Sequence, residues 1–209
     1  ENTTTGFLIQ DSISYAGGIL GGTSNFIKNA LNVAAYATIF EIPNDENPIK
    51  GVLSISSSLS HILPQYYNNE GTWEWGIGAT QVDKLYIDGM NIARGSDTVY
   101  NLEFLWDNMI ELSVPIAENI LWGEIYASAT GYKSNLEDVS TLNASDFYFG
   151  TGAGIRLAIP GFPLGLYLTK NFYFDDSLNF HWVPGEILAD PADSESGFKL
   201  VLAITTTLY

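Results

Sequence analysis

Few side chains in this sequence could do acid–base or metal chemistry. The chain has no Cys and only two His, His61 and His181, among its 209 residues. Without thiolates it cannot build a disulfide framework or a thiolate metal site, and two imidazoles are too few for an all-His catalytic zinc site. Neither His lies beside a nucleophile motif such as G-x-S-x-G. We therefore expect a protein that is not an enzyme, with no metal and no cofactor.

The charged side chains are strongly biased toward acid. Lys and Arg total 8 against 24 Asp and Glu, which gives a formal net charge of −16. With so few cations to meet phosphates, no nucleic-acid partner is expected. Most acids gather in connections between apolar segments, where we expect them to be solvated: Asp45, Glu46, Glu137, Asp138, Asp175, Asp176, Glu186, Asp190, Asp193 and Glu195. None of these connections has the spacing of a calcium hand.

The apolar segments that must position these charges alternate with period two. Leu53 and Ile55 share one parity, for example, while Ser54 and Ser56 share the other. A β-strand places two such sets on opposite faces. Eight segments show this pattern, at about 6–16, 28–41, 50–61, 98–114, 120–133, 147–159, 164–174 and 198–209. The sequence therefore predicts an all-β, antiparallel fold of about eight strands.

The length and composition of these strands favour a membrane barrel. Their second face is small and uncharged, whereas the outer face of a soluble barrel or sandwich, the alternative, would carry many charges. A strand needs about 9–11 residues to cross a bilayer, and most of these segments reach that length. The long connections 62–97, 134–146 and 175–197 alternate with the shorter 42–49, 115–119 and 160–163. An outer-membrane barrel alternates long outer loops with short periplasmic turns in this way.

The longest connection, 62–97, is long enough to suggest a function of its own. It ends in the segment Asp83–Gly95, DKLYIDGMNIARG, which holds Arg94, one of two Arg in the chain. This segment resembles the inward-folding loop of BamA-like outer-membrane assembly proteins. Asp88-Gly89 stand where that family has Gly-Gly, and Ala93-Arg94-Gly95 stand for its Val-Arg-Gly. Ser96 replaces the usual aromatic residue.

Further motifs follow in the order that this family has them. Segments 110–116, 121–129, 150–156 and 160–164 resemble its E-L-x-x-P-[IL], F-[VW]-D-x-G, S-x-G-x-G-[LV]-R and P-x-G-P-[IL] elements, so the resemblance covers 83–209. The family's barrel has sixteen strands, and five of them follow the Arg loop. Five predicted strands follow Arg94 here and three precede it. The resemblance thus implies strands 9–16 of a sixteen-stranded barrel, with the N-terminal repeats and first eight strands outside residues 1–209.

The resemblance also implies a partner for Arg94 inside the barrel. Glu111 has the inward, polar parity of the strand after the loop, and it matches the family's acid for this contact. The family's second acid falls at Ser128, and Glu124, of the same parity, is the candidate substitute. The alternative is that Arg94 is an exposed loop cation, as most Arg are. A separation of more than about 6 Å between Arg94 and Glu111 would favour that alternative.

The last strand is the other candidate site. Leu200, Leu202, Ile204 and Leu208 share one face, and Tyr209 is a terminal aromatic one residue out of that row. In the family this strand forms a seam whose edge could pair with an incoming strand.

The implied function is a BamA-like insertase in the outer membrane of a diderm bacterium. Its partners would be outer-membrane lipids, unfolded outer-membrane protein clients, and accessory periplasmic lipoproteins bound through an N-terminal region. Two alternatives remain open. One is a two-partner-secretion-type translocator of the same superfamily, and the other is a passive porin-like channel.

Overall fold

The chain folds into one long antiparallel sheet with two small hairpins beside it. A computed structural model describes residues 3–44, 48–117, 120–159 and 163–204. The strands of the main sheet are β1 (Gly6–Ala16), β2 (Phe26–Ile42), β3 (Ile49–Leu63), β8 (Phe104–Ala117), β9 (Leu121–Lys133), β10 (Phe147–Leu157), β11 (Leu164–Phe174), β12 (Phe180–Trp182) and β13 (Lys199–Ile204). Strands that follow one another here pair antiparallel, except that β12 and β13 both pair with β11. The all-β, antiparallel prediction is confirmed.

Each of the eight predicted segments contains a strand of this sheet, and two of the segments differ from their strands by more than two residues at one or both ends. The predicted strand 98–114 is broken into β7 (Val99–Leu102) and β8. The last predicted strand, 198–209, is described only as far as Ile204, so Leu208 and Tyr209 lie outside the described residues.

The backbone departs from regular strand geometry just before the break between β7 and β8. Asn101 has a φ of +64°, the left-handed conformation that Asn tolerates better than most residues. Asn101 lies within β7, which pairs with β6 (Leu85–Ile87) instead of β3, and the chain bends at Glu103 before β8 begins. Leu102 is fully buried against Leu105, although strict alternation through 98–114 would place these two residues on opposite faces.

The two faces of the sheet differ as the alternation predicts. One face, which we call the apolar face, leaves large hydrophobic side chains in solvent: Ile9, Ile55, Ile110, Ile125 and Leu202 are each 43–64% exposed. The register places Ile55 beside Ile110, so these residues form continuous rows across strands. The opposite face, the inner face, carries Ser54, Ser56 and the buried polar residues described below.

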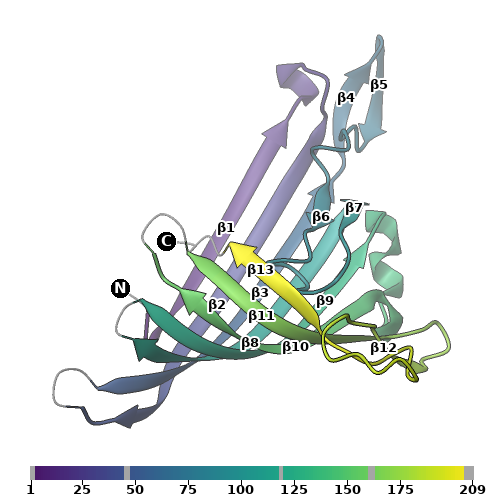
Figure 1. Ribbon diagram of the computed structural model, residues 1–209. Helices are drawn as coiled ribbons and strands as arrows, with labels where there is room; N and C mark the ends of the chain where they lie inside the picture. The colour runs from purple at the N-terminus through teal and green to yellow at the C-terminus, as the bar shows by residue number, and fades with distance from the viewer. Residues whose placement is uncertain (1–2, 45–47, 118–119, 160–162, 205–209) are drawn as a thin grey trace.

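The two ends of the sheet also differ. At one end of the sheet β2 ends and β3 begins, β8 ends and β9 begins, and β10 ends and β11 begins. At the other end lie η1 (Gly18–Leu20), the hairpin of β4 (Gln65–Asn69) and β5 (Thr72–Gly76), and the segment holding η2 (Leu136–Thr141) and η3 (Ala144–Asp146). Figure 1 shows the β4–β5 hairpin projecting beyond the ends of β1–β3. On the apolar face near this end, aromatic rings contact one another in a band: Trp106, Phe147, Phe149, Phe172, Phe174, Phe180 and Trp182.

The sheet is curved but open (Figure 1). Among the described residues β1 pairs only with β2, and β13 pairs only with β11, so no ladder joins the two edges. Within the same residues, no helix is both long enough and apolar enough to cross a membrane.

Candidate functional site

The loop before β7 is folded around one aspartate. The Oδ1 of Asp88 accepts the backbone N–H groups of Met90, Asn91 and Ile92, each at 2.9 Å. Gly89 follows at a φ of +69°, where a Cβ would approach the Ser96 carbonyl oxygen to 2.3 Å. The N–H of Gly95 closes the loop on the carbonyl of Gly89 at 2.8 Å. The hydrogen bonds of Asp88 and Gly89 are therefore made within the loop, and these two residues set its shape.

An apolar cluster fixes the loop on the inner face. Ile87 and Ala93 from the loop pack with Leu102 and Leu105, and all four are buried. Ala93 takes a φ of +51°, an unusual conformation for a residue with a Cβ. This backbone bend is followed at once by Arg94, whose side chain enters the layer of polar residues on the sheet.

Arg94 is buried, with 5% of its surface exposed. Its Nη1 donates to Oε2 of Glu111 at 3.2 Å. This distance is well below the separation of about 6 Å above which the exposed-cation alternative would be favoured. The guanidinium carbon lies 4.2 Å from the ring centroid of Tyr167 and 4.8 Å from that of Tyr126. Its backbone carbonyl accepts the side-chain amide of Asn171 at 2.8 Å. Arg94 is thus held by one charge, two aromatic rings and an amide, and the exposed-cation alternative does not describe it.

A second ion pair lies beside the first. Glu124, 3% exposed, accepts the Nε of Arg156 and the hydroxyl of Tyr167, the latter at 2.6 Å. Glu124 was a candidate partner for Arg94, but it pairs with Arg156 because the β9–β10 register places the two side chains diagonally across neighbouring strands. Ser113 bridges the pairs, with its Oγ 3.3 Å from Glu111 and 3.4 Å from Glu124. Both Arg of the chain are therefore in one buried network.

Glycines on β10 and β11 make room for the two tyrosines. A Cβ at Gly152 would lie 2.7 Å from the Tyr126 ring, and one at Gly154 or Gly165 would lie 2.4 Å from the Tyr167 ring. The rings themselves meet edge to face, with centroids 5.9 Å apart. Ring packing on the inner face therefore explains Gly152 and Gly154 of the G-x-G-x-G alternation, whereas a Cβ at Gly150 would approach the Asn171 and Ser128 side chains.

Tyr126, Tyr167, Arg156 and Asn171 were not predicted as site residues. Tyr126 has the same parity as Glu124, and the glycines on the next strand signal a space that a large side chain fills. These two features together could have identified it. Nothing in the local sequence of Tyr167 or Asn171 sets them apart from other inward residues of β11.

The last strand splits between the two faces. Leu200, Leu202 and Ile204 lie on the apolar face, opposite Leu168, Leu166 and Leu164 of β11. Val201 and Ala203 point inward and pack with Tyr126 and Tyr167. The strand therefore touches the inner network through its inward residues and not through the predicted ones.

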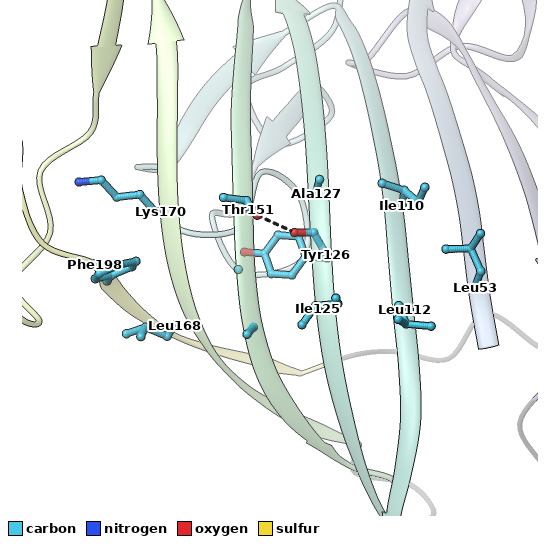
Figure 2. Close-up of a pocket in the computed structure, with 12 residues that line it drawn as sticks. Leu53, Ile110, Leu112, Ile125, Tyr126, Ala127, Thr151, Leu168, Lys170 and Phe198 are labelled. Atoms are coloured by element: carbon cyan, nitrogen blue, oxygen red, sulfur yellow. Dashed lines mark hydrogen bonds between the residues drawn. The ribbon is translucent and has the colours of Figure 1, made fainter. Parts of the chain in front are cut away.

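The apolar face has a shallow hollow of about 660 Å³, shown in Figure 2. It forms where the small side chains of Ala127, Thr151 and Ala153 lie between larger ones such as Ile110 and Leu168. Lys170 is the single ionisable side chain at its rim apart from Tyr126, and its Nζ donates to three backbone carbonyls. The hollow thus offers apolar contact and no acid–base group free to react.

Among the described residues, no group of His, Asp and Glu side chains is arranged to hold a metal ion. Searches of family profiles, curated proteins and solved structures found no match to this chain.

Proposed function

We propose that the chain is the C-terminal half of the transmembrane barrel of a BamA-like assembly factor, which inserts other barrel proteins into the outer membrane of a diderm bacterium. The observation that carries the proposal is the position of Arg94. A loop residue is buried on the inner face and paired with the one acid, Glu111, that the family resemblance implies.

The apolar face supports a lipid environment. A protein in water gains nothing from leaving rows of Ile and Leu exposed, whereas lipid would cover them. Seven of the nine strands of the sheet, all but β12 and β13, have 11 residues or more, which is enough to span a bilayer when tilted. The aromatic band lies on the same face, near the end with the long connections, which is where an interfacial girdle belongs.

The open edges support the reading of a half-barrel. Unpaired backbone groups in lipid cost several kcal/mol each, so a membrane barrel must close. The edges of β1 and β13 would then be covered by eight further strands that residues 1–209 do not include. The insertase needs no hydrolysis, because burial of the client's apolar face in lipid is itself favourable.

Insertion of a client barrel by the full-length protein tests the proposal. The protein would be reconstituted in liposomes and mixed with a urea-unfolded client, whose folding is followed by its gel mobility. We expect wild-type protein to speed folding and Arg94→Ala and Glu111→Ala to slow it. Glu41→Ala is the matched control, since Glu41 is half exposed and 4.0 Å from Lys50.

The alternatives give different results in this experiment. A porin-like channel would conduct ions without speeding client insertion, and Arg94→Ala would change only its conductance. A secretion translocator would pass one partner protein through its lumen and leave unrelated clients unfolded. Either result would overturn the proposal.

A further inference from the structure

The edge of β11 is shared between two short strands. β12 pairs with residues 172–174, and β13 pairs with residues 164–169. Between them, residues 183–198 leave the sheet and return, and we call this segment the strap. The strap closes on itself through backbone hydrogen bonds between Gly185 and Ser196 and between Ile187 and Phe198. It is therefore an ordered element, but nothing in the main sheet pairs with most of it.

Lys170 holds the base of the strap. Its ammonium donates to the carbonyls of Glu195 at 2.6 Å, Gly197 at 2.7 Å and Val183 at 3.2 Å. An ammonium group has three N–H donors, and all three are used. Both ends of the strap are thus tied to β11 by a contact with backbone oxygens.

His181 holds the strap at a second point. Its Nδ1 lies 3.4 Å from Oε1 of Glu195 on the strap, and its Nε2 lies 3.2 Å from Oδ2 of Asp175 in the β11–β12 turn. The imidazole stacks on Tyr173, with centroids 5.3 Å apart. The second oxygen of Glu195 accepts the backbone N–H of Trp182 at 3.3 Å.

Whether both hydrogen bonds of His181 can form depends on its protonation state, which changes with pH. A neutral imidazole carries one N–H and can donate to one carboxylate, whereas an imidazolium carries two and can donate to both. The two carboxylates flank the two ring nitrogens, so the arrangement is satisfied only by the charged form. We propose that His181 is a pH-dependent latch that clasps the strap to the β11–β12 turn when charged and releases Glu195 when neutral.

The charges around His181 support the latch. Hydrogen bonds to Asp175 and then to Glu195 raise the pKa of His181 above its usual value of about 6.5. Asp175 stays ionised because Asn179 and its backbone hold its pKa at about 2. Besides these two acids, the titratable groups among the described residues that contact His181 or its partners are the Tyr173 ring and the Lys170 ammonium, the latter through the Glu195 carbonyl. With a raised pKa, the clasp is complete below about pH 6.5 and is lost as pH rises through the higher folded value.

Amide hydrogen exchange of the full chain in detergent micelles tests the latch. We expect the protection of strap amides, corrected for the intrinsic rate, to fall between about pH 5.5 and pH 8.5. Each unit by which the pKa of His181 is raised corresponds to about a tenfold change in the latching equilibrium. His181→Gln should remove this pH step, and Glu195→Gln should remove it while lowering the His181 pKa measured by NMR.

The chain offers a matched control in its other imidazole. His61→Gln changes the same residue type on β3 and should leave the strap's pH step intact. A step that persists in His181→Gln, or wild-type protection that does not change between the two pH values, would overturn the latch. Failure of the client-insertion experiment would not, because the latch rests on the strap alone.

Discussion

The guanidinium of Arg94 and the carboxylate of Glu111 lie 3.2 Å apart on the inner face, although they are 17 residues apart in sequence. The contact ties an irregular loop to a regular strand. Arg suits this position because its planar group can pair with a carboxylate and stack on Tyr126 and Tyr167 together. A Lys ammonium would keep the charge but lose the stacking.

Removing the acid should leave a buried cation unpaired. We expect Glu111→Ala to lower the free energy of unfolding by about 3–5 kcal/mol, the usual cost of breaking a buried pair from one side. Denaturant titration in micelles measures it. Glu41→Ala, which removes half of the exposed pair with Lys50, should cost at most about 1 kcal/mol. Equal losses for the two variants would show that burial gives the Arg94 pair no special role.

The hydroxyl of Tyr167 orients the ring beneath Arg94 by donating to Glu124. Tyr167→Phe keeps the ring and removes only this bond, so we expect a loss of about 1.5–3 kcal/mol, typical of a hydrogen bond to a charged group. Tyr86→Phe changes an exposed ring in β6 and should shift stability by less than about 0.5 kcal/mol. A Tyr167→Phe variant as stable as wild type would contradict this role for the hydroxyl.

Gly95 is constrained both by its backbone and by its neighbours. Its φ is +84°, and a Cβ would approach Thr169 Oγ1 to 2.3 Å. Gly71 has a φ of +95° in open space, so Gly71→Ala introduces only the backbone strain. We expect Gly95→Ala to destabilise by about 1–3 kcal/mol more than Gly71→Ala, the range for overpacking. Thermal unfolding of both variants gives the comparison, and matching losses would exclude the steric contact.

The sequence predicted which face of the sheet a residue occupies better than it predicted which residues lie beside it on neighbouring strands. Alternation such as Ile55 and Ser56 indicates which side of a strand a residue takes, and each of the eight segments predicted from it contains a strand of the main sheet. The short β12, inside the predicted connection 175–197, was missed. Parity does not fix the register between strands, so it could not show that Glu124 would meet Arg156. The break after β7 was missed because Asn101 is compatible with a regular strand as well as with the left-handed conformation that it takes. The Arg94–Glu111 contact was predicted only because parity and the family resemblance agreed.

The β11–β12 turn is predicted to lose stability at low pH, when Asp175 becomes protonated. Asn179 donates its side chain and its backbone N–H to Asp175, and these bonds hold the pKa of Asp175 at about 2. Because the folded pKa is below the usual value of about 3.9, the contribution of this turn is present above about pH 4 and is lost as pH falls through the folded value. A carboxyl ¹³C titration by NMR should show this midpoint.

Asn179→Ala should move the Asp175 midpoint up toward the usual value. Asn135→Ala removes a similar amide contact, to Asp138 in another connection, and should leave the Asp175 titration unchanged. An Asp175 midpoint that stays low in Asn179→Ala would mean that another group holds the carboxylate.

The most direct test of the account is a structure of the intact protein in lipid nanodiscs. We predict that β1 is paired along its free edge with a preceding strand of a closed barrel, that the apolar face meets lipid, and that Arg94 stays within hydrogen-bond distance of Glu111 inside the lumen. A sheet that packs its apolar face against protein in water, or an Arg94 loop that lies outside the barrel, would contradict it.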